Sequence, residues 1–270
     1  MFVAGFPIRE FRPMTLLSSS RARAQRLGAA IATLAVLAAF TNSAFAASQA
    51  PDISDCALEE HANDAVRACS AWVAKVDIDA ATRAKVLGLR AKAWMNQEEP
   101  EAAVGDFTQA IKLDPQNAEL LRSRARAYTI LGTHDLAAAD WAAVLGLEPK
   151  DDDAYYHRGQ SQLNDGKTQE ALADFDKAIE INARNIEAFI GRGRAYAKLD
   201  QRDKSMQELA AALKLDPAYI PAHLARAELA DSWGQTQVAV ESYQEALKYN
   251  GMNLKVRREL QRLGVFTPPN

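Results

Sequence analysis

The sequence has few of the residues that build metal, haem or catalytic centres. It contains two cysteines and four histidines in 270 residues. No Cys-x-x-Cys-His motif is present, which excludes covalent haem attachment. The histidines show no His-x-x-x-His spacing, and none lies beside a nucleophile with an orienting acid. They are His61, His134, His157 and His223. The sequence therefore predicts a protein that is not an enzyme, with no catalytic residues, no cofactor and no metal site.

A hydrophobic run long enough to cross a membrane is also missing. The uncharged apolar stretch over residues 27–40 has fourteen residues, whereas a span needs about 20. Arginines precede it, and small residues follow at Ala44 and Ala46. This pattern predicts a bacterial secretory signal peptide over residues 1–46, cleaved after Ala46, and a periplasmic or secreted protein with no membrane attachment after cleavage. An uncleaved anchor is the alternative, and either Met1 or Met14 fits as the start.

The sequence also has no large excess of either acidic or basic residues. The net charge is −3, and five basic residues but one acidic residue precede residue 47, so the chain without its signal segment carries −7. Such a weakly acidic surface has no electrostatic reason to bind nucleic acid or anionic lipid.

The two cysteines, Cys56 and Cys69, lie thirteen residues apart just after the signal segment. An even pair in an exported chain predicts a disulfide, which stabilises the fold by about 3 kcal/mol if it acts through chain entropy. Buried thiols, or a redox or metal role, are the alternatives. We expect the disulfide to staple a degenerate helical pair over residues 47–83, which caps the rest of the chain.

The remaining sequence is built of repeats. Five blocks of 34 residues are arranged without a gap, at 84–117, 118–151, 152–185, 186–219 and 220–253. Position 8 is small in every block (Ala91, Ala125, Gly159, Gly193, Ala227). Position 24 is large and apolar (Phe107, Trp141, Phe175, Leu209, Tyr243). Position 15 interrupts two helical stretches (Glu98, Gly132, Gly166, Asp200, Gly234).

These blocks resemble the tetratricopeptide repeat (TPR) family over 170 residues. The resemblance implies an all-α fold, a right-handed superhelical solenoid of antiparallel helix pairs. It also implies a concave face lined mainly by the first helix of each pair, and a role in binding proteins or peptides. Residues 254–270 place Val256, Leu260 and Leu263 on one helical face, which predicts a C-terminal capping helix followed by a loose tail.

Two more positions carry charge in a regular pattern. Position 7 is always arginine (Arg90, Arg124, Arg158, Arg192, Arg226). Position 23 is acidic in four blocks (Asp106, Asp140, Asp174, Glu208) and is Ser242 in the fifth. An arginine near a helix crossing can bury its stem and offer its fork to a carboxylate, so we predict a structural ladder of ion pairs. A row of arginines that binds an acidic ligand is the alternative.

The family's ligand-facing positions give a candidate peptide-binding groove. Carried over position by position, they include Lys85, Lys92, Arg122, Arg126, Tyr156, Gln160, Ile190, Arg194 and Leu224. The hypothesis is that a peptide places its acidic end near Arg122 and Arg126 and its apolar anchors near Tyr156 and Ile190. The alternative is that these are ordinary solvated positions.

The functional prediction is a non-catalytic, monomeric adaptor or scaffold of the bacterial cell envelope that binds a protein or peptide. The adaptor role follows from the family resemblance and the envelope from the signal peptide. Two alternatives stay open: a structural protein that assembles into homo-oligomers, and an accessory subunit of a secreted enzyme complex. The sequence does not identify the partner.

Overall fold

The computed structural model describes residues 53–57 and 62–265, which belong to one compact unit, Ile53–Asn270. The predicted signal peptide and the tail from Thr267 lie outside these residues. The described residues form helices and no strand, which confirms the all-α prediction. The elements are η1(Ile53–Ala57), α2(Ala62–Val73), α3(Ala80–Asn96), α4(Pro100–Leu113), α5(Ala118–Ile130), α6(His134–Leu147), α7(Asp152–Asn164), α8(Thr168–Ile181), α9(Ile186–Lys198), α10(Arg202–Leu215), α11(Ile220–Ser232), α12(Thr236–Tyr249) and α13(Leu254–Arg262).

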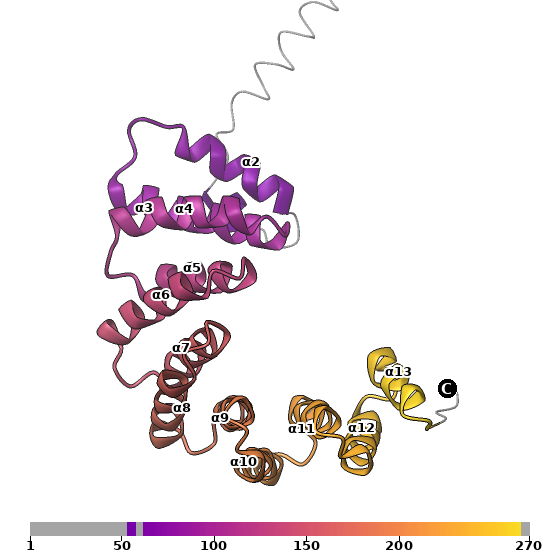
Figure 1. Cartoon of the computed structure of the whole chain (residues 1–270). Helices are drawn as coiled ribbons and strands as arrows, with labels where there is room; N and C mark the ends of the chain where they lie inside the picture. Colours follow the sequence, from indigo (N-terminus) through magenta and orange to yellow (C-terminus); the bar gives the residue numbers. More distant parts are fainter. Residues whose placement is uncertain (1–52, 58–61, 266–270) are drawn as a thin grey trace, which may run out of the picture. The chain divides into compact units, whose positions relative to one another are not determined.

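The helices follow the period of the sequence. Helices α3 to α12 form consecutive pairs, and the two helices of each pair pack side by side (Figure 1). From α5 onward every first helix begins at position 1 of its block, so α7, α9 and α11 each begin 34 residues after the first helix before them. The exception is α3, which begins at Ala80, four residues before the first block. The pairs follow one another along an arc, and the first helices α5, α7, α9 and α11 lie on its inner side (Figure 1).

Side chains at fixed positions start and stop these helices. Asn117, Asp151, Asn185 and Asn253 each accept a hydrogen bond from the backbone N–H three residues on, at 3.0–3.3 Å. Such N-caps satisfy a donor that the helix itself leaves unpaired. Two residues after each first helix ends, the backbone has positive φ, at Gly132, Gly166 and Gly234 as expected, and at the non-glycine residues Glu98 and Asp200.

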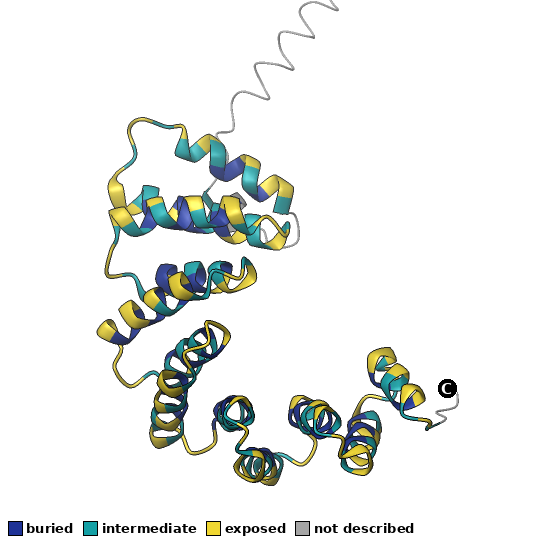
Figure 2. Ribbon diagram, in the orientation of Figure 1, coloured by how far each residue is buried: buried dark blue, intermediate teal, exposed yellow. Residues whose placement is uncertain are grey.

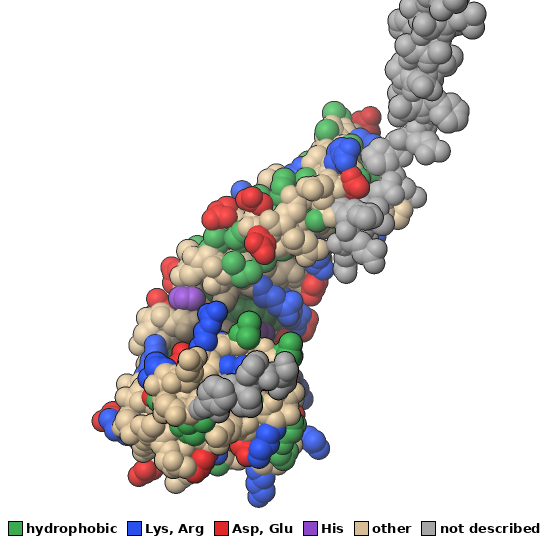
Figure 3. All heavy atoms as spheres, turned by 90° about the vertical axis from the view of Figure 1, so that its right-hand side faces the viewer, with side chains coloured by type: hydrophobic (Ala, Val, Ile, Leu, Met, Phe, Trp, Pro, Cys, Tyr) green, Lys and Arg blue, Asp and Glu red, His purple; other side chains and the backbone are tan. Residues whose placement is uncertain are grey.

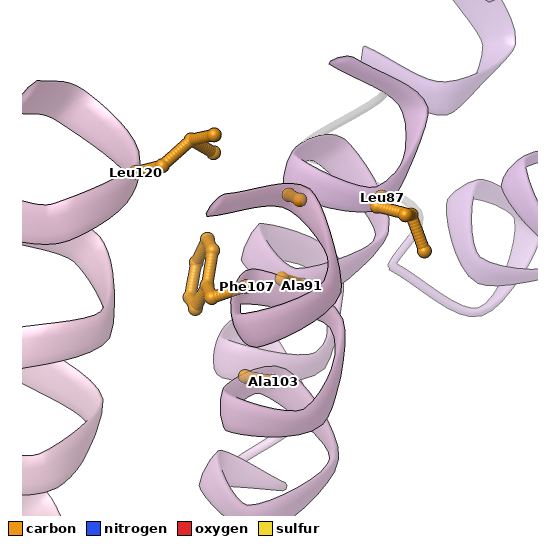
Figure 4. Close-up of a cluster of buried hydrophobic side chains, with 6 residues drawn as sticks. Leu87, Ala91, Ala103, Phe107 and Leu120 are labelled. Atoms are coloured by element: carbon orange, nitrogen blue, oxygen red, sulfur yellow. The ribbon is translucent and has the colours of Figure 1, made fainter. Parts of the chain in front are cut away.

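The core is linear, because each pair buries its apolar face against the next one. The large residue at position 24 is buried in every block (Phe107, Trp141, Phe175, Leu209, Tyr243). Figure 2 shows buried residues where helices face one another and exposed residues on the outer surfaces. In the first pair, Phe107 of α4 packs with Ala91 of α3, and Leu120 of α5 joins them from the next pair (Figure 4).

The N-terminal cap differs from the predicted helical pair. A five-residue 3-10 helix, η1, stands in place of a first helix and packs on α2. Helix α2 ends at Val73, and the Arg83 guanidinium donates to the carbonyl oxygens of Val73 and Lys75 at 2.8 and 2.7 Å. Val76, in the turn that follows, is 87% exposed. At the other end, Val256 and Leu260 of α13 are buried as expected.

Both cysteines are buried in one cluster of the cap. Cys56 lies on η1 and Cys69 on α2, and the Sγ atom of Cys69 is 3.7 Å from the carbonyl oxygen of Cys56. Burial raises the pKa of the Cys69 thiol well above its usual value. The structure therefore brings the two residues together as thiols, and the disulfide between them stays a prediction.

Candidate ligand-binding face

The inner side of the arc carries two adjoining hollows. Figure 3 looks toward this side and shows basic and acidic side chains interspersed along it. The N-terminal hollow has a volume of about 410 Å³, and the second hollow about 730 Å³. Arg126 of α5 lines both of them.

The N-terminal hollow combines an apolar wall with a charged rim. Leu89, Ala93 and Met95 of α3 line it together with Phe107 of α4. Its polar lining is Lys92, Asn96, Glu119, Ser123 and Arg126. Cys56 and Ala65 close it from the cap. Such a lining suits a ligand with apolar groups beside a charged one.

The second hollow lies where α5, α6 and α7 meet. The His157 ring stacks on Trp141, with ring centroids 4.7 Å apart and an interplanar angle of 15°. Burial and the nearby Arg126 charge lower the pKa of His157, so its ring is neutral at pH 7. The positive charge in this hollow therefore comes from Arg122, Arg126 and Lys150, opposite Glu148, Asp151 and Asp153.

Two of the four basic residues of the predicted groove form ion pairs within the protein, and two do not. Arg122 pairs with Glu148 and Asp151, and Lys92 Nζ lies 3.1 Å from Glu119. The pKa of Asp151 is lowered although burial alone would raise it, because the Arg122 hydrogen bond and backbone N–H groups outweigh burial. Lys85 and Arg126 are exposed and have no hydrogen bond or ion pair with any described residue. Within the described part of the chain, Arg126 is therefore the unpaired cation that lines both hollows, and Lys150 is a second unpaired cation in the second hollow.

The predicted apolar anchors pack largely inside the protein, so the groove hypothesis is wrong in giving them to a bound peptide. Ile190 is 1% exposed and packs against Leu209 and Ala222, so it cannot anchor a ligand. Leu224 is partly buried against the C-terminal core cluster. Tyr156 is half-buried, and its hydroxyl donates to Glu187 at 3.4 Å.

Two further groove residues lie on the same row of the first helices. Gln160 of α7 is partly buried, and its Oε1 atom has no hydrogen-bond partner in the described part of the chain. Arg194 of α9 is partly buried and likewise makes no ion pair with a described residue. The Arg194 guanidinium therefore stays without a carboxylate among the described residues, whereas the unpartnered Oε1 atom of Gln160 is buried away from solvent.

The arginines of position 7 form the predicted contacts with position 23 in four blocks. In the first three, Nε and an Nη atom of the arginine donate to both oxygens of the aspartate at 2.6–2.8 Å (Arg90–Asp106, Arg124–Asp140, Arg158–Asp174). Arg192 donates to Glu208 through Nη2 alone at 2.6 Å, and its buried Nε stays without a partner. The longer glutamate side chain thus loses the bidentate geometry that aspartate provides.

A second acceptor of these arginines was missed in the sequence. In three of the arginines the other Nη atom donates to a side chain on the preceding helix. The pairs are Arg90–Ser70, Arg124–Thr108 and Arg192–Asp176. Thr108 and Asp176 both occupy position 25 of their block, so the signal was present in the repeat alignment. The arginines therefore join neighbouring pairs as well as the two helices of one pair.

No group of three or more histidine, cysteine or acidic side chains that could hold a metal ion occurs in the described part of the chain. No helix in residues 53–57 and 62–265 is long and apolar enough to span a membrane.

Comparison with known families identifies the repeats. Tetratricopeptide repeat models match residues 89–144, 152–185 and 186–219. No curated protein sequence matches the chain. The helix pairs described above therefore include tetratricopeptide repeats.

Solved structures give the same fold. The thermophilic TPR protein TTC0263 of Thermus thermophilus is 24% identical with a TM-score of 0.58, and the match covers 67% of this chain and 98% of that one. PilW, a type IV pilus biogenesis factor, is 20% identical with a TM-score of 0.56, covering 66% and 86%. YrrB, a TPR protein with an unusual peptide-binding site, is 18% identical with a TM-score of 0.50, covering 73% and 99%. At these identities the likeness shows the fold, which is an all-helical TPR solenoid.

Proposed function

We propose that this chain is a non-catalytic, monomeric protein-binding scaffold of the bacterial cell envelope. It holds a segment of a partner protein on its concave face, between α3 and α7. The observation that carries this proposal is the pair of adjoining hollows that share Arg126, a cation with no acceptor among the described residues.

The lining of the hollows defines the chemistry of the bound segment. An acidic side chain would reach Arg126, and an apolar neighbour would lie against Leu89 and Met95 in the N-terminal hollow. TPR proteins with this fold bind proteins or peptides, and YrrB is described as having a peptide-binding site. The proposed ligand is therefore an extended segment with acidic and apolar residues close together.

The envelope location rests on the N-terminal sequence pattern alone. Export through residues 1–46 would leave a chain that begins at Ala47. The mass of the protein purified from the envelope fraction tests this directly. An intact N-terminus in the cytoplasmic fraction would contradict the location without affecting the binding proposal.

Charge reversal at Arg126 is expected to weaken partner binding at least about tenfold. The reversed charge would repel the acidic segment and would add a third carboxylate beside Glu119 and Asp153, which also line the hollows. The measurement is calorimetric titration of the Arg126→Glu chain with the partner captured by the wild-type chain and identified by mass spectrometry.

Lys112→Glu is the matched control, because it makes the same charge change at an exposed residue of α4, outside both hollows. It should bind the partner as the wild type does. Equal affinities of the wild-type and Arg126→Glu chains would remove Arg126 from the binding face.

A further inference from the structure

The fifth arginine of the ladder has no carboxylate. Arg226 of α11 is partly buried and makes no hydrogen bond or ion pair with any described residue. Its four counterparts each hold a carboxylate at 2.6–2.8 Å. The Arg226 guanidinium therefore has hydrogen-bonding capacity that no described residue uses.

Both positions that supply acceptors elsewhere are occupied by small residues here. Position 23 is Ser242, which is fully buried and donates its hydroxyl proton to the carbonyl oxygen of Val238 at 2.7 Å. Position 25 of the preceding block, which holds Asp176 beside Arg192, is Ala210. Ala210 is exposed, so the position that would bear the second acceptor lies open to solvent.

This position is distinct from the concave face. Arg226 lies two residues after Leu224 and two before Glu228, both on the row of concave positions. At 3.6 residues per turn, a separation of two residues turns the side chain by about 200°, to the opposite side of α11. By the register of the other pairs, Arg226 lies where α10, α11 and α12 meet.

We propose that Arg226 is a docking point for an acidic side chain, aspartate or glutamate, of a partner protein. The incoming carboxylate takes the place that Asp140 and Asp174 hold in their own pairs, accepting from Nε and an Nη atom. The chain then contacts partners on two sides, with Arg226 acting independently of the concave hollows.

The test uses a short peptide of alternating glutamate and alanine, titrated into the purified chain. The Nε–H resonance of Arg226, assigned by its loss in Arg226→Lys, is expected to shift saturably in NMR spectra. The glutamine counterpart of the peptide should leave it unmoved, and the Nε–H resonance of Arg158 should not respond to either peptide, because its fork is filled by Asp174.

Ser242→Asp supplies the missing carboxylate within the chain and should weaken peptide binding at Arg226 at least about tenfold. Ala173→Asp adds the same charge at an exposed residue of α8 and should leave the response unchanged. Arg126→Glu should also preserve it, which separates this site from the concave face. No shift at Arg226, or an equal shift in Ser242→Asp, would overturn the proposal.

Discussion

Asp140→Ala is expected to destabilise the solenoid by about 3–5 kcal/mol. The substitution leaves the Arg124 guanidinium, in a side chain that is only 16% exposed, without its carboxylate. The other hydrogen-bonding partner of Arg124 is the neutral hydroxyl of Thr108, which cannot compensate the charge. Chemical denaturation followed by circular dichroism measures the loss of unfolding free energy.

The matched control is Glu180→Ala. Glu180 accepts from Lys177 at 2.9–3.0 Å, but the pair lies on the surface, where solvent screens it. Its removal should change the unfolding free energy by no more than about 0.5 kcal/mol. If Asp140→Ala also fell within that range, the internal ion pairs would not stabilise the fold.

Gly191→Ala is expected to cost up to about 3 kcal/mol. A Cβ atom at Gly191 would lie 2.6 Å from Cε1 of Phe175 and 2.7 Å from Cζ. The ring has little room to move away, because the backbone of Gly159 also lies close to it. A Cβ atom at Gly159 would be 2.9 Å from the same Cε1 atom. Overpacking of this kind forces backbone shifts. Thermal unfolding of the variant checks the effect.

Gly105→Ala should change the stability in the opposite direction. Gly105 lies within α4, where an added Cβ would meet no atom within 4 Å. Alanine there should therefore stabilise the helix by up to about 1 kcal/mol. Phe175→Leu combined with Gly191→Ala should recover part of the loss if the ring is the obstacle. A Gly191→Ala chain as stable as the wild type would show that the pairs shift apart easily.

Positions that recur with the repeat could be predicted from the sequence. A fixed spacing places equivalent residues in equivalent surroundings, so Phe107 and Trp141 proved buried and Gly132 adopts positive φ. The same logic located the partners of Arg90 and Arg124. These features depend on contacts within one repeat or between adjacent ones, which the period itself defines.

Features that depend on one particular neighbour could not be predicted in this way. Ile190 shares its position with Tyr156, yet small residues on α11, among them Ala222, allow that helix to cover Ile190. The cap departs from the period altogether, and no sequence motif indicates that Arg83 donates to the carbonyl oxygens of Val73 and Lys75. Whether a groove residue is exposed therefore depends on the next helix, and its position within the repeat does not determine it.

The central claim is that the concave face between α3 and α7 binds a partner protein. Site-specific photo-crosslinking in living cells tests it most directly, with the crosslinking residue at Asn96 in the N-terminal hollow or at Ala143, which is exposed on α6 and outside both hollows. If a partner binds there, Asn96 gives one defined crosslinked protein from the envelope and Ala143 gives none. Crosslinks from Ala143 alone, or the same products from both positions, would contradict it.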